Sequence, residues 1–220
     1  LIIAKLFKHK FILEVRDLWP QMLLDQGGMS KKSLTFKILL FMERQLYKSS
    51  EKIIILAKGM KNHIKEIGGN NIIWLPNGPD LNNFKFSLLP EDSSIFSKKR
   101  PLKLIYTGAH GESNDLQNVI CAAKILKDLP VLFIFVGDGP EKKSLIKASF
   151  GMKNVKFIDP VPKNEIPKML NSSDATLISL KNTKLFSYGV SPNKLYDSYA
   201  IGRPVITNIP GNINDEVEKY

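Results

Sequence analysis

The sequence contains one cysteine, which excludes an internal disulfide framework. Cys121 lies in the apolar stretch 119–123, and we expect it to be a buried structural thiol. A lone reduced thiol suits a reducing cytosol. Zinc-ligand spacing is also lacking, because His9, His63 and His110 are scattered along the chain.

Long hydrophobic runs are absent as well. No uninterrupted apolar stretch approaches the roughly 20 residues that a membrane-spanning helix needs. The opening stretch 1–7 is too short for a signal peptide, and a charged residue, Lys5, interrupts it after four apolar residues. It also does not start with Met. We interpret it as the tail of a helix. The sequence also has neither a Gly-x-Ser-x-Gly elbow nor a Walker loop, so it offers no sign of a serine hydrolase or a P-loop nucleotidase.

The net charge is +11, yet no run of five basic residues occurs. The lysines are spread along the chain, so one interpretation is a solvated, lysine-rich surface. The other is attraction to an anionic membrane face or to a diphosphate substrate. We expect no nucleic-acid partner, because basic and aromatic residues do not alternate as they do on a base-stacking surface.

Short runs rich in β-branched residues predict strands at 11–15, 52–56, 72–75, 102–107, 131–136, 155–158, 175–179 and 204–207. Most carry apolar residues at consecutive positions, which is typical of parallel strands buried on both faces. Helical periodicity lies between them, at 31–48, 59–67, 114–129, 141–150, 164–171 and 192–200. The alternation predicts an α/β fold with parallel sheets.

The alternation is interrupted once, at the turn-forming stretch 76–80 and the polar stretch that follows it. A fresh βαβ series starts at the strand 102–107. We therefore expect two domains, 1–78 and 79–220.

Polar side chains follow the first predicted strand directly, at Arg16 and Asp17. In open α/β sheets ligands gather at the carboxyl ends of strands, so these two residues are candidate site residues. The alternative is a local Arg16–Asp17 ion pair that closes a loop, with Trp19 as a core anchor.

Glycine turns follow two strands of the second series. Gly108, His110 and Gly111 lie in the first turn, and Gly137 and Asp138 lie in the second. Glycine allows a backbone to approach a ligand closely, and a helix that starts behind it presents free N–H groups to a phosphate. The spacing is not the dinucleotide fingerprint, so purely structural turns remain open, with Ser113 or Asn114 as a helix cap and Pro140 at the first helical position.

The richest stretch is 188–206. We expect Ser191 to cap a helix whose first residue is Pro192. Lys194 would then lie in the first turn, where the helix dipole disfavours a cation unless an anion is bound. Lys194 and Asp197 are three residues apart and share a face, so they either face one ligand or form an exposed ion pair.

Taken together, these stretches resemble glycosyltransferase family 4, in its capsule and O-antigen branch. The matching segments are 15–20, 76–80, 106–111, 136–140 and 191–206, in family order. The resemblance implies a GT-B fold of two Rossmann-like domains, an acceptor domain (1–78, incomplete) and a donor domain (79–220). It also implies a retaining transfer from a nucleotide-diphosphate sugar, a UDP-sugar, with neither a cofactor nor a metal.

The resemblance also implies residue roles. Asp197 stands where the family has a glutamate that binds the ribose, while Gly189 replaces the family's other glutamate. Lys194 and the helix start behind Gly111 would neutralise the diphosphate. The donor site would comprise eight residues: Gly108, Gly111, Gly137, Asp138, Ser191, Asn193, Lys194 and Asp197.

Asp17 would accept a proton from the acceptor, with Arg16 and His110 as further catalytic candidates. The resemblance implies a lipid-linked or saccharide acceptor and a cytoplasmic protein that is peripheral at the inner membrane face. Family members have a strand and a glycine-rich loop before this region and helices after it, so we interpret the chain as a fragment. Two rival functions stay open: a GT-B sugar-nucleotide 2-epimerase and a non-catalytic, membrane-associated module.

Overall fold

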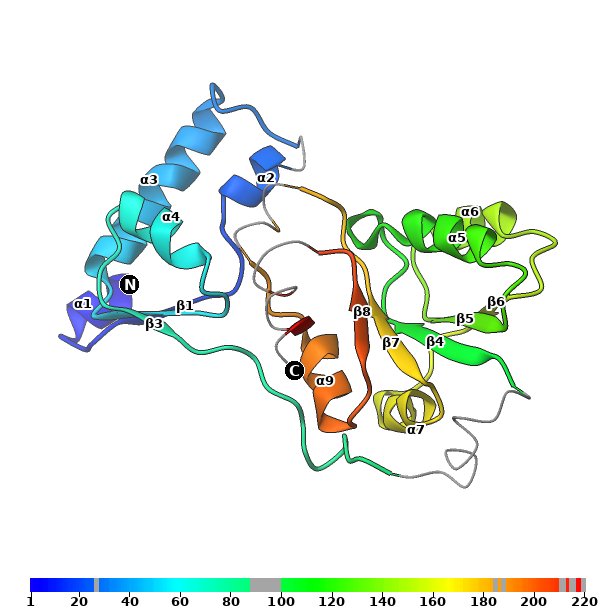
Figure 1. Cartoon of the computed structure of the whole chain (residues 1–220). Coiled ribbons are helices and arrows are strands. Elements are labelled where there is room, and N and C mark those ends of the chain that lie inside the picture. The colour runs from blue at the N-terminus through cyan, green and yellow to red at the C-terminus, as the bar shows by residue number, and fades with distance from the viewer. Residues whose placement is uncertain are drawn as a thin grey trace. The chain divides into compact units, whose positions relative to one another are not determined.

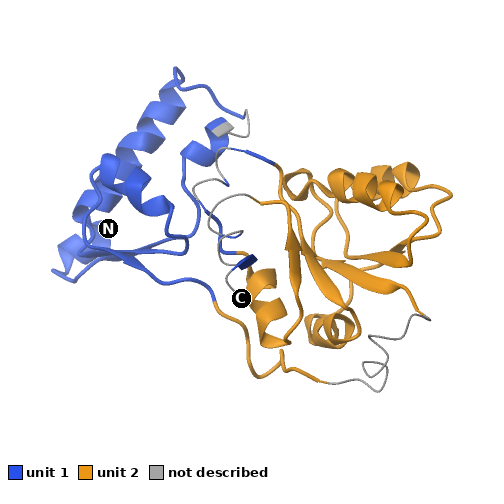
Figure 2. Ribbon diagram, in the orientation of Figure 1, with its two compact units in different colours: residues 1–77, 182–191, 210–220 blue, residues 78–181, 192–209 orange. Residues whose placement is uncertain are grey.

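The computed structural model describes residues 1–25, 28–87, 100–183, 186, 189–209, 213 and 217–218. The chain divides into two compact units. Unit 1 comprises 1–77, 182–191 and 210–220, and unit 2 comprises 78–181 and 192–209 (Figure 2). The first boundary falls one residue before the one that we expected. The segments 182–191 and 210–220, which we placed in the second domain, group with unit 1.

Unit 1 is built on a three-stranded parallel sheet in the order β1-β2-β3. The strands are β1 (Ile12–Val15), β2 (Lys52–Ile55) and β3 (Ile72–Trp74). The helices are α1 (Ile2–Leu6), α2 (Gln21–Asp25), α3 (Leu34–Ser49) and α4 (Met60–Glu66) (Figure 1). A core from strands and helices holds them together, and it includes Val15, Tyr47, Ile53, Ile55 and Ile64.

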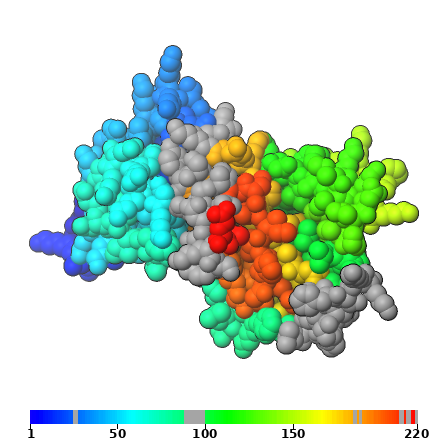
Figure 3. Space-filling view, in the orientation of Figure 1, coloured from blue at the N-terminus to red at the C-terminus, as the bar shows by residue number. Residues whose placement is uncertain are grey.

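Unit 2 is built on a five-stranded parallel sheet in the order β6-β5-β4-β7-β8. The strands are β4 (Leu102–Thr107), β5 (Val131–Val136), β6 (Val155–Ile158), β7 (Ala175–Ile178) and β8 (Val205–Thr207). The α-helices are α5 (Leu116–Ile125), α6 (Lys142–Ala148), α7 (Ile166–Asn171) and α9 (Asn193–Ala200), with short 3-10 helices η2 (Glu112–Asn114) and η3 (Lys163–Glu165). α9 and β8 lie on the face shown in Figure 3.

The sheet of unit 2 is buried on both faces. Successive residues of β4 alternate between two cores: Tyr106 packs with α5 and α6, and Ile105 packs with α7 and the end of α9. Consecutive apolar residues are needed for such a strand, since its side chains alternate between the faces. The predicted α/β class with parallel sheets is confirmed.

Several local expectations were wrong. α2 was not predicted, because five residues are too few to show helical periodicity. Cys121 is exposed, not buried. The buried positions of α5 are Leu116, Ile120 and Ala123, and Cys121 is rotated by one residue, about 100°, from that stripe.

Three predicted helix starts also differ. Asp115, with a left-handed φ of 44°, precedes α5 in place of Ser113 or Asn114. α6 starts at Lys142, two residues after Pro140. Pro192, not Ser191, is the residue before α9, and the Pro192 side chain makes no capping hydrogen bond.

Two glycine turns meet at the carboxyl ends of β4 and β5. Gly108 N–H donates to the Val136 carbonyl over 2.9 Å, and Gly137 N–H donates to the Ile158 carbonyl over 3.1 Å. Gly137 has a φ of 138°, and a Cβ atom there would overlap the Gly108 carbonyl oxygen. The close approach of the two turns therefore requires glycine at position 137.

We predict that Gly137→Ala destabilises unit 2 by about 1–3 kcal/mol more than Gly151→Ala does, because only the former forces a steric overlap. Gly151 also has a positive φ, 79°, but its Cβ atom would meet nothing within 4 Å. Thermal unfolding of both variants measures the difference. Equal losses would show that backbone conformation alone, and not the contact with Gly108, demands glycine at position 137.

Candidate functional site

The glycine turns after β4 and β5 are joined by backbone hydrogen bonds. His110 N–H donates to the Asp138 carbonyl over 2.8 Å, and Glu141 N–H donates to the His110 carbonyl over 2.9 Å. The Asp138 carboxylate accepts from the Gly139 N–H over 2.8 Å and so shapes its own turn. Four of the predicted site residues, Gly108, His110, Gly137 and Asp138, are therefore brought together.

The His110 ring is fully buried. Tyr106, Phe135 and Phe157 surround it at centroid distances of 6.0–6.4 Å. Neither ring nitrogen has a hydrogen-bond partner among the described residues. Burial lowers the His110 pKa, and the nearby Lys142 and Lys194 lower it further, against an opposing effect of Asp138. The lowered pKa favours the uncharged imidazole in the interior of unit 2, and the catalytic role of His110 stays a prediction.

Lys194 lies in the first turn of α9, and its side chain reaches the Gly108 turn. Its ammonium donates to the Tyr106 hydroxyl over 2.9 Å and lies 4.0 Å from the centroid of the Tyr106 ring. A Cβ atom at Gly108 would lie 3.0 Å from Nζ and from Cε of Lys194. The turn after β4 and the start of α9 therefore converge within unit 2, as the sequence predicts.

The Lys194 ammonium has no carboxylate within ion-pair distance in the part of the chain that the structure describes. The alternative of a Lys194–Asp197 ion pair is therefore not observed. Burial lowers the Lys194 pKa to about 8. A partly buried cation that faces a ring and a hydroxyl, with no anionic group beside it among the described residues, is a site that an anionic ligand would stabilise.

Asp197 is partly buried on the same helix. Burial has the largest effect on the Asp197 pKa and raises it. The charge of Lys163 lowers this pKa, and the charge of Asp80 raises it. The Asp80 carboxylate accepts from the Asn82 N–H over 3.1 Å and from the Asn83 side chain over 2.6 Å. The charged groups that act on Asp197 are therefore Lys163 and Asp80, and neither of them acts on Lys194.

The remaining donor-side candidates have different surroundings. Gly111 precedes η2, so the first α-helical turn does not start behind it as expected; α5 starts only at Leu116. Asn193 is exposed at the start of α9. Ser191 belongs to unit 1, where its hydroxyl accepts from the Asn77 N–H over 3.2 Å and its carbonyl accepts from the Asn77 side chain over 2.7 Å.

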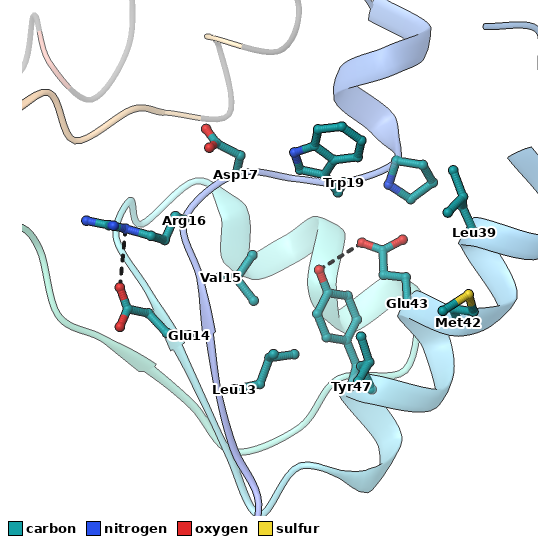
Figure 4. A pocket seen from close by; sticks show the side chains of 12 residues that line it. Leu13, Glu14, Val15, Arg16, Asp17, Trp19, Leu39, Met42, Glu43 and Tyr47 are labelled. Atoms are coloured by element: carbon teal, nitrogen blue, oxygen red, sulfur yellow. Dashed lines mark hydrogen bonds and ion pairs between the residues drawn. The ribbon is translucent and has the colours of Figure 1, made fainter. Parts of the chain in front are cut away.

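Arg16 and Asp17 follow β1 in unit 1. Arg16 pairs with Glu14 over 3.4 Å, so the alternative of an Arg16–Asp17 pair is not observed (Figure 4). Trp19 is 52% exposed and is not a core anchor; Leu18 takes that place. Arg16, Asp17 and Trp19 line a pocket of about 460 Å³ between β1 and α3.

A buried carboxyl also lines this pocket. The Glu43 side chain of α3 is only 6% exposed. Its Oε1 accepts from the Tyr47 hydroxyl over 2.8 Å, and its Oε2 has no partner among the described residues. Burial raises the Glu43 pKa to about 7, against smaller opposing effects of Tyr47 and Arg44.

Sequence reasoning missed Tyr106 and Glu43. Tyr106 belongs to an apolar strand and is indistinguishable there from a core residue. Glu43 lies inside a helix with charged neighbours, although its spacing of four residues from the buried Tyr47 is a signal that could have placed it on the inner face.

Residues 101–219 match the profile of the family described as Glycosyl transferases group 1. The chain belongs to this family. It is 26% identical over 214 residues to the Escherichia coli (strain K12) protein WcaI, which is named as a colanic acid biosynthesis glycosyl transferase, over 91% of this chain and 51% of WcaI. It is 24% identical over 204 residues to WbjE of Pseudomonas aeruginosa, named as a glycosyltransferase, over 90% of this chain and 50% of WbjE. The chain thus spans about half the length of these relatives.

Solved structures agree with the fold. Anabaena HepE in complex with UDP and glucose is similar with a TM-score of 0.66 and 18% identity, over 97% of this chain and 56% of that one. WaaG, a glycosyltransferase involved in lipopolysaccharide biosynthesis, gives a TM-score of 0.67 and 15% identity, over 94% of this chain and 59% of that one. The fold is therefore of the GT-B type, as the resemblance implied.

We predict that Glu43→Gln changes how stability depends on pH. The raised pKa means that the folded protein binds this proton more tightly than the unfolded chain does. The free energy of unfolding should therefore fall as the pH rises from about 4.5 to 7, by at most roughly 3 kcal/mol, because one pKa unit corresponds to about 1.4 kcal/mol. Glu43→Gln should remove this fall and be the more stable protein at pH 8.

Urea unfolding of unit 1, monitored by circular dichroism at pH 4.5 and at pH 8, measures the change in the free energy of unfolding. Glu66→Gln, at an exposed position of α4, is the matched control. An unchanged pH dependence in Glu43→Gln would show that this carboxyl is not the group that titrates.

Proposed function

We propose that this chain is part of a retaining glycosyltransferase of the family 4 kind, in the capsule and O-antigen branch, that uses a nucleotide-diphosphate sugar as donor. The observation that carries the proposal is the Lys194 ammonium against the Gly108 turn, without a carboxylate among the described residues. A diphosphate is the ligand chemistry that fits such a cation. UDP as the nucleotide is supported by HepE, whose structure is named as a complex with UDP and glucose.

The proposed mechanism follows from charge. The diphosphate gains negative charge as the bond to the sugar breaks, and a cation placed beforehand lowers the free energy of that transition state. Lys194 supplies the positive charge. Glycine at positions 108 and 137 lets the backbone of the joined turns come close to the diphosphate. Asp197, which is partly buried on the same helix, would hold the ribose hydroxyls.

The acceptor is proposed to be a lipid-linked or other saccharide at the inner face of an anionic membrane. The net charge of +11 and the names of WcaI and WaaG support this. Asp17, which lines the pocket between β1 and α3, would accept the proton of the reacting hydroxyl, and Arg16 beside it would orient the acceptor. None of the described helices is long and apolar enough to pass through a bilayer.

The burial of His110 disfavours the epimerase alternative. That reaction uses acidic and histidine side chains to abstract a proton from the sugar, and the ring of His110 is enclosed by three aromatic residues of unit 2. A transfer reaction makes no such demand, because positioning and charge stabilisation suffice.

We predict that Lys194→Ala weakens UDP binding by about tenfold to a hundredfold, since a charge-assisted hydrogen bond contributes about 1.5–3 kcal/mol. Isothermal titration calorimetry of the protein with UDP at pH 7 measures the loss. Lys124→Ala, at an exposed position of α5, removes the same charge away from the turn and should bind UDP like the unmodified protein. Unchanged affinity in Lys194→Ala would remove this residue from the donor site.

A further inference from the structure

The Tyr106 hydroxyl links two segments of unit 2. It donates to the Ala109 carbonyl over 2.8 Å and accepts from the Lys194 ammonium over 2.9 Å. Ala109 belongs to the turn after β4, and Lys194 belongs to the first turn of α9. One hydroxyl therefore fixes the distance between the turn and the cation.

The ring of Tyr106 makes a second contact with Lys194. The ammonium lies 4.0 Å from the ring centroid, which is cation–π distance. With no carboxylate nearby in the described part of the chain, the ring face and the hydroxyl oxygen are the groups that offset the burial of this cation. The ammonium is thereby held at the Gly108 turn and does not extend into solvent.

Core packing explains the ring of Tyr106 but not its hydroxyl. The side chain is fully buried, and its ring packs against Phe135 at a centroid distance of 6.4 Å. A phenylalanine would fill this place equally well. The Ala109 carbonyl already accepts from the Asn114 side chain over 2.9 Å, so it does not depend on the hydroxyl for a partner. The remaining task of the hydroxyl is to hold Lys194.

We infer that Tyr106 is a positioning residue that holds the Lys194 ammonium against the Gly108 turn and so raises the affinity of this site for a diphosphate. The inference rests on the proposed function for the ligand, but the contact itself is a property of the free protein. It predicts that Tyr106 acts on the ligand only through Lys194.

Tyr106→Phe tests this, because it removes the hydroxyl and keeps the ring. The UDP dissociation constant should rise about threefold to tenfold, the effect of losing one hydrogen bond that orders the cation. In a Lys194→Ala background the same substitution should change UDP affinity by less than about twofold. Tyr199→Phe, which removes a tyrosine hydroxyl from α9 and leaves Tyr106 intact, is the matched control and should bind UDP normally.

A second readout does not require UDP. An ammonium is stabilised in its charged form by donating to a hydroxyl, so Tyr106→Phe should lower the Lys194 pKa below its value of about 8. NMR titration of the lysine Cε resonances in the free protein measures this shift. The UDP affinity of Tyr106→Phe should correspondingly start to decline at a lower pH than that of the unmodified protein.

The outcomes separate the two proposals. If UDP does not bind the unmodified protein but Tyr106→Phe lowers the Lys194 pKa, the donor assignment fails and the positioning contact stands. If Tyr106→Phe leaves both the Lys194 pKa and the UDP affinity unchanged, the positioning role is wrong. The positioning role is also wrong if Tyr106→Phe lowers UDP affinity by the same factor in the Lys194→Ala background as in the unmodified protein. Tyr106 would then act by general destabilisation, which thermal unfolding would detect.

Discussion

A lysine ammonium costs free energy when it is partly buried with no carboxylate nearby, and among the described residues the candidate site of unit 2 is arranged around such a lysine, Lys194. Burial lowers the Lys194 pKa to about 8, so the folded protein holds this proton more weakly than the unfolded chain does. The free energy of unfolding should therefore rise between pH 8 and pH 10.5, as the cost of the charge disappears. Such a cost without structural benefit is typical of functional sites, where stability is given up for binding.

The parallel sheet of unit 2 places the other parts of the site. β4 and β5 are neighbours in register from Leu102 to Thr107, so their carboxyl ends coincide and their turns meet. Glycine at 108 and 137 lets the two backbones touch, and the hydrogen bonds through His110 and Asp138 join them. The start of α9 then brings Lys194 to the same edge. Short turns on a rigid sheet keep these groups in place before any ligand binds.

Much of this arrangement could be predicted from the sequence, because parallel strands that are buried on both faces have apolar residues at consecutive positions. Every predicted strand is present to within one residue at each end, since apolar residues at consecutive positions are what a strand buried on both faces requires. The convergence of the Gly108 turn and Lys194 followed from the rule that ligand sites lie at the carboxyl ends of strands.

Details that depend on packing could not be predicted. Whether Cys121 is buried depends on the rotation of α5 about its axis, which local composition does not determine. Which residues precede α5 and α9, namely Asp115 and Pro192, depends on backbone angles that residue preference only biases. Tyr106 was missed because the polar atom of a buried side chain gains its role from a partner distant in the sequence: Lys194 is 88 residues from Tyr106. Glu43 was missed because charged neighbours hide which face of α3 is buried, although its partner Tyr47 is only four residues away.

Proton uptake on UDP binding tests the central claim most directly. Calorimetry at pH 8.5 in buffers of different ionisation enthalpy counts the protons that the complex gains. If Lys194 is the cation that meets the diphosphate, the protein should take up more than about half a proton per UDP, because a group with a pKa near 8 is mostly deprotonated at that pH before binding. UDP binding without proton uptake would contradict the account.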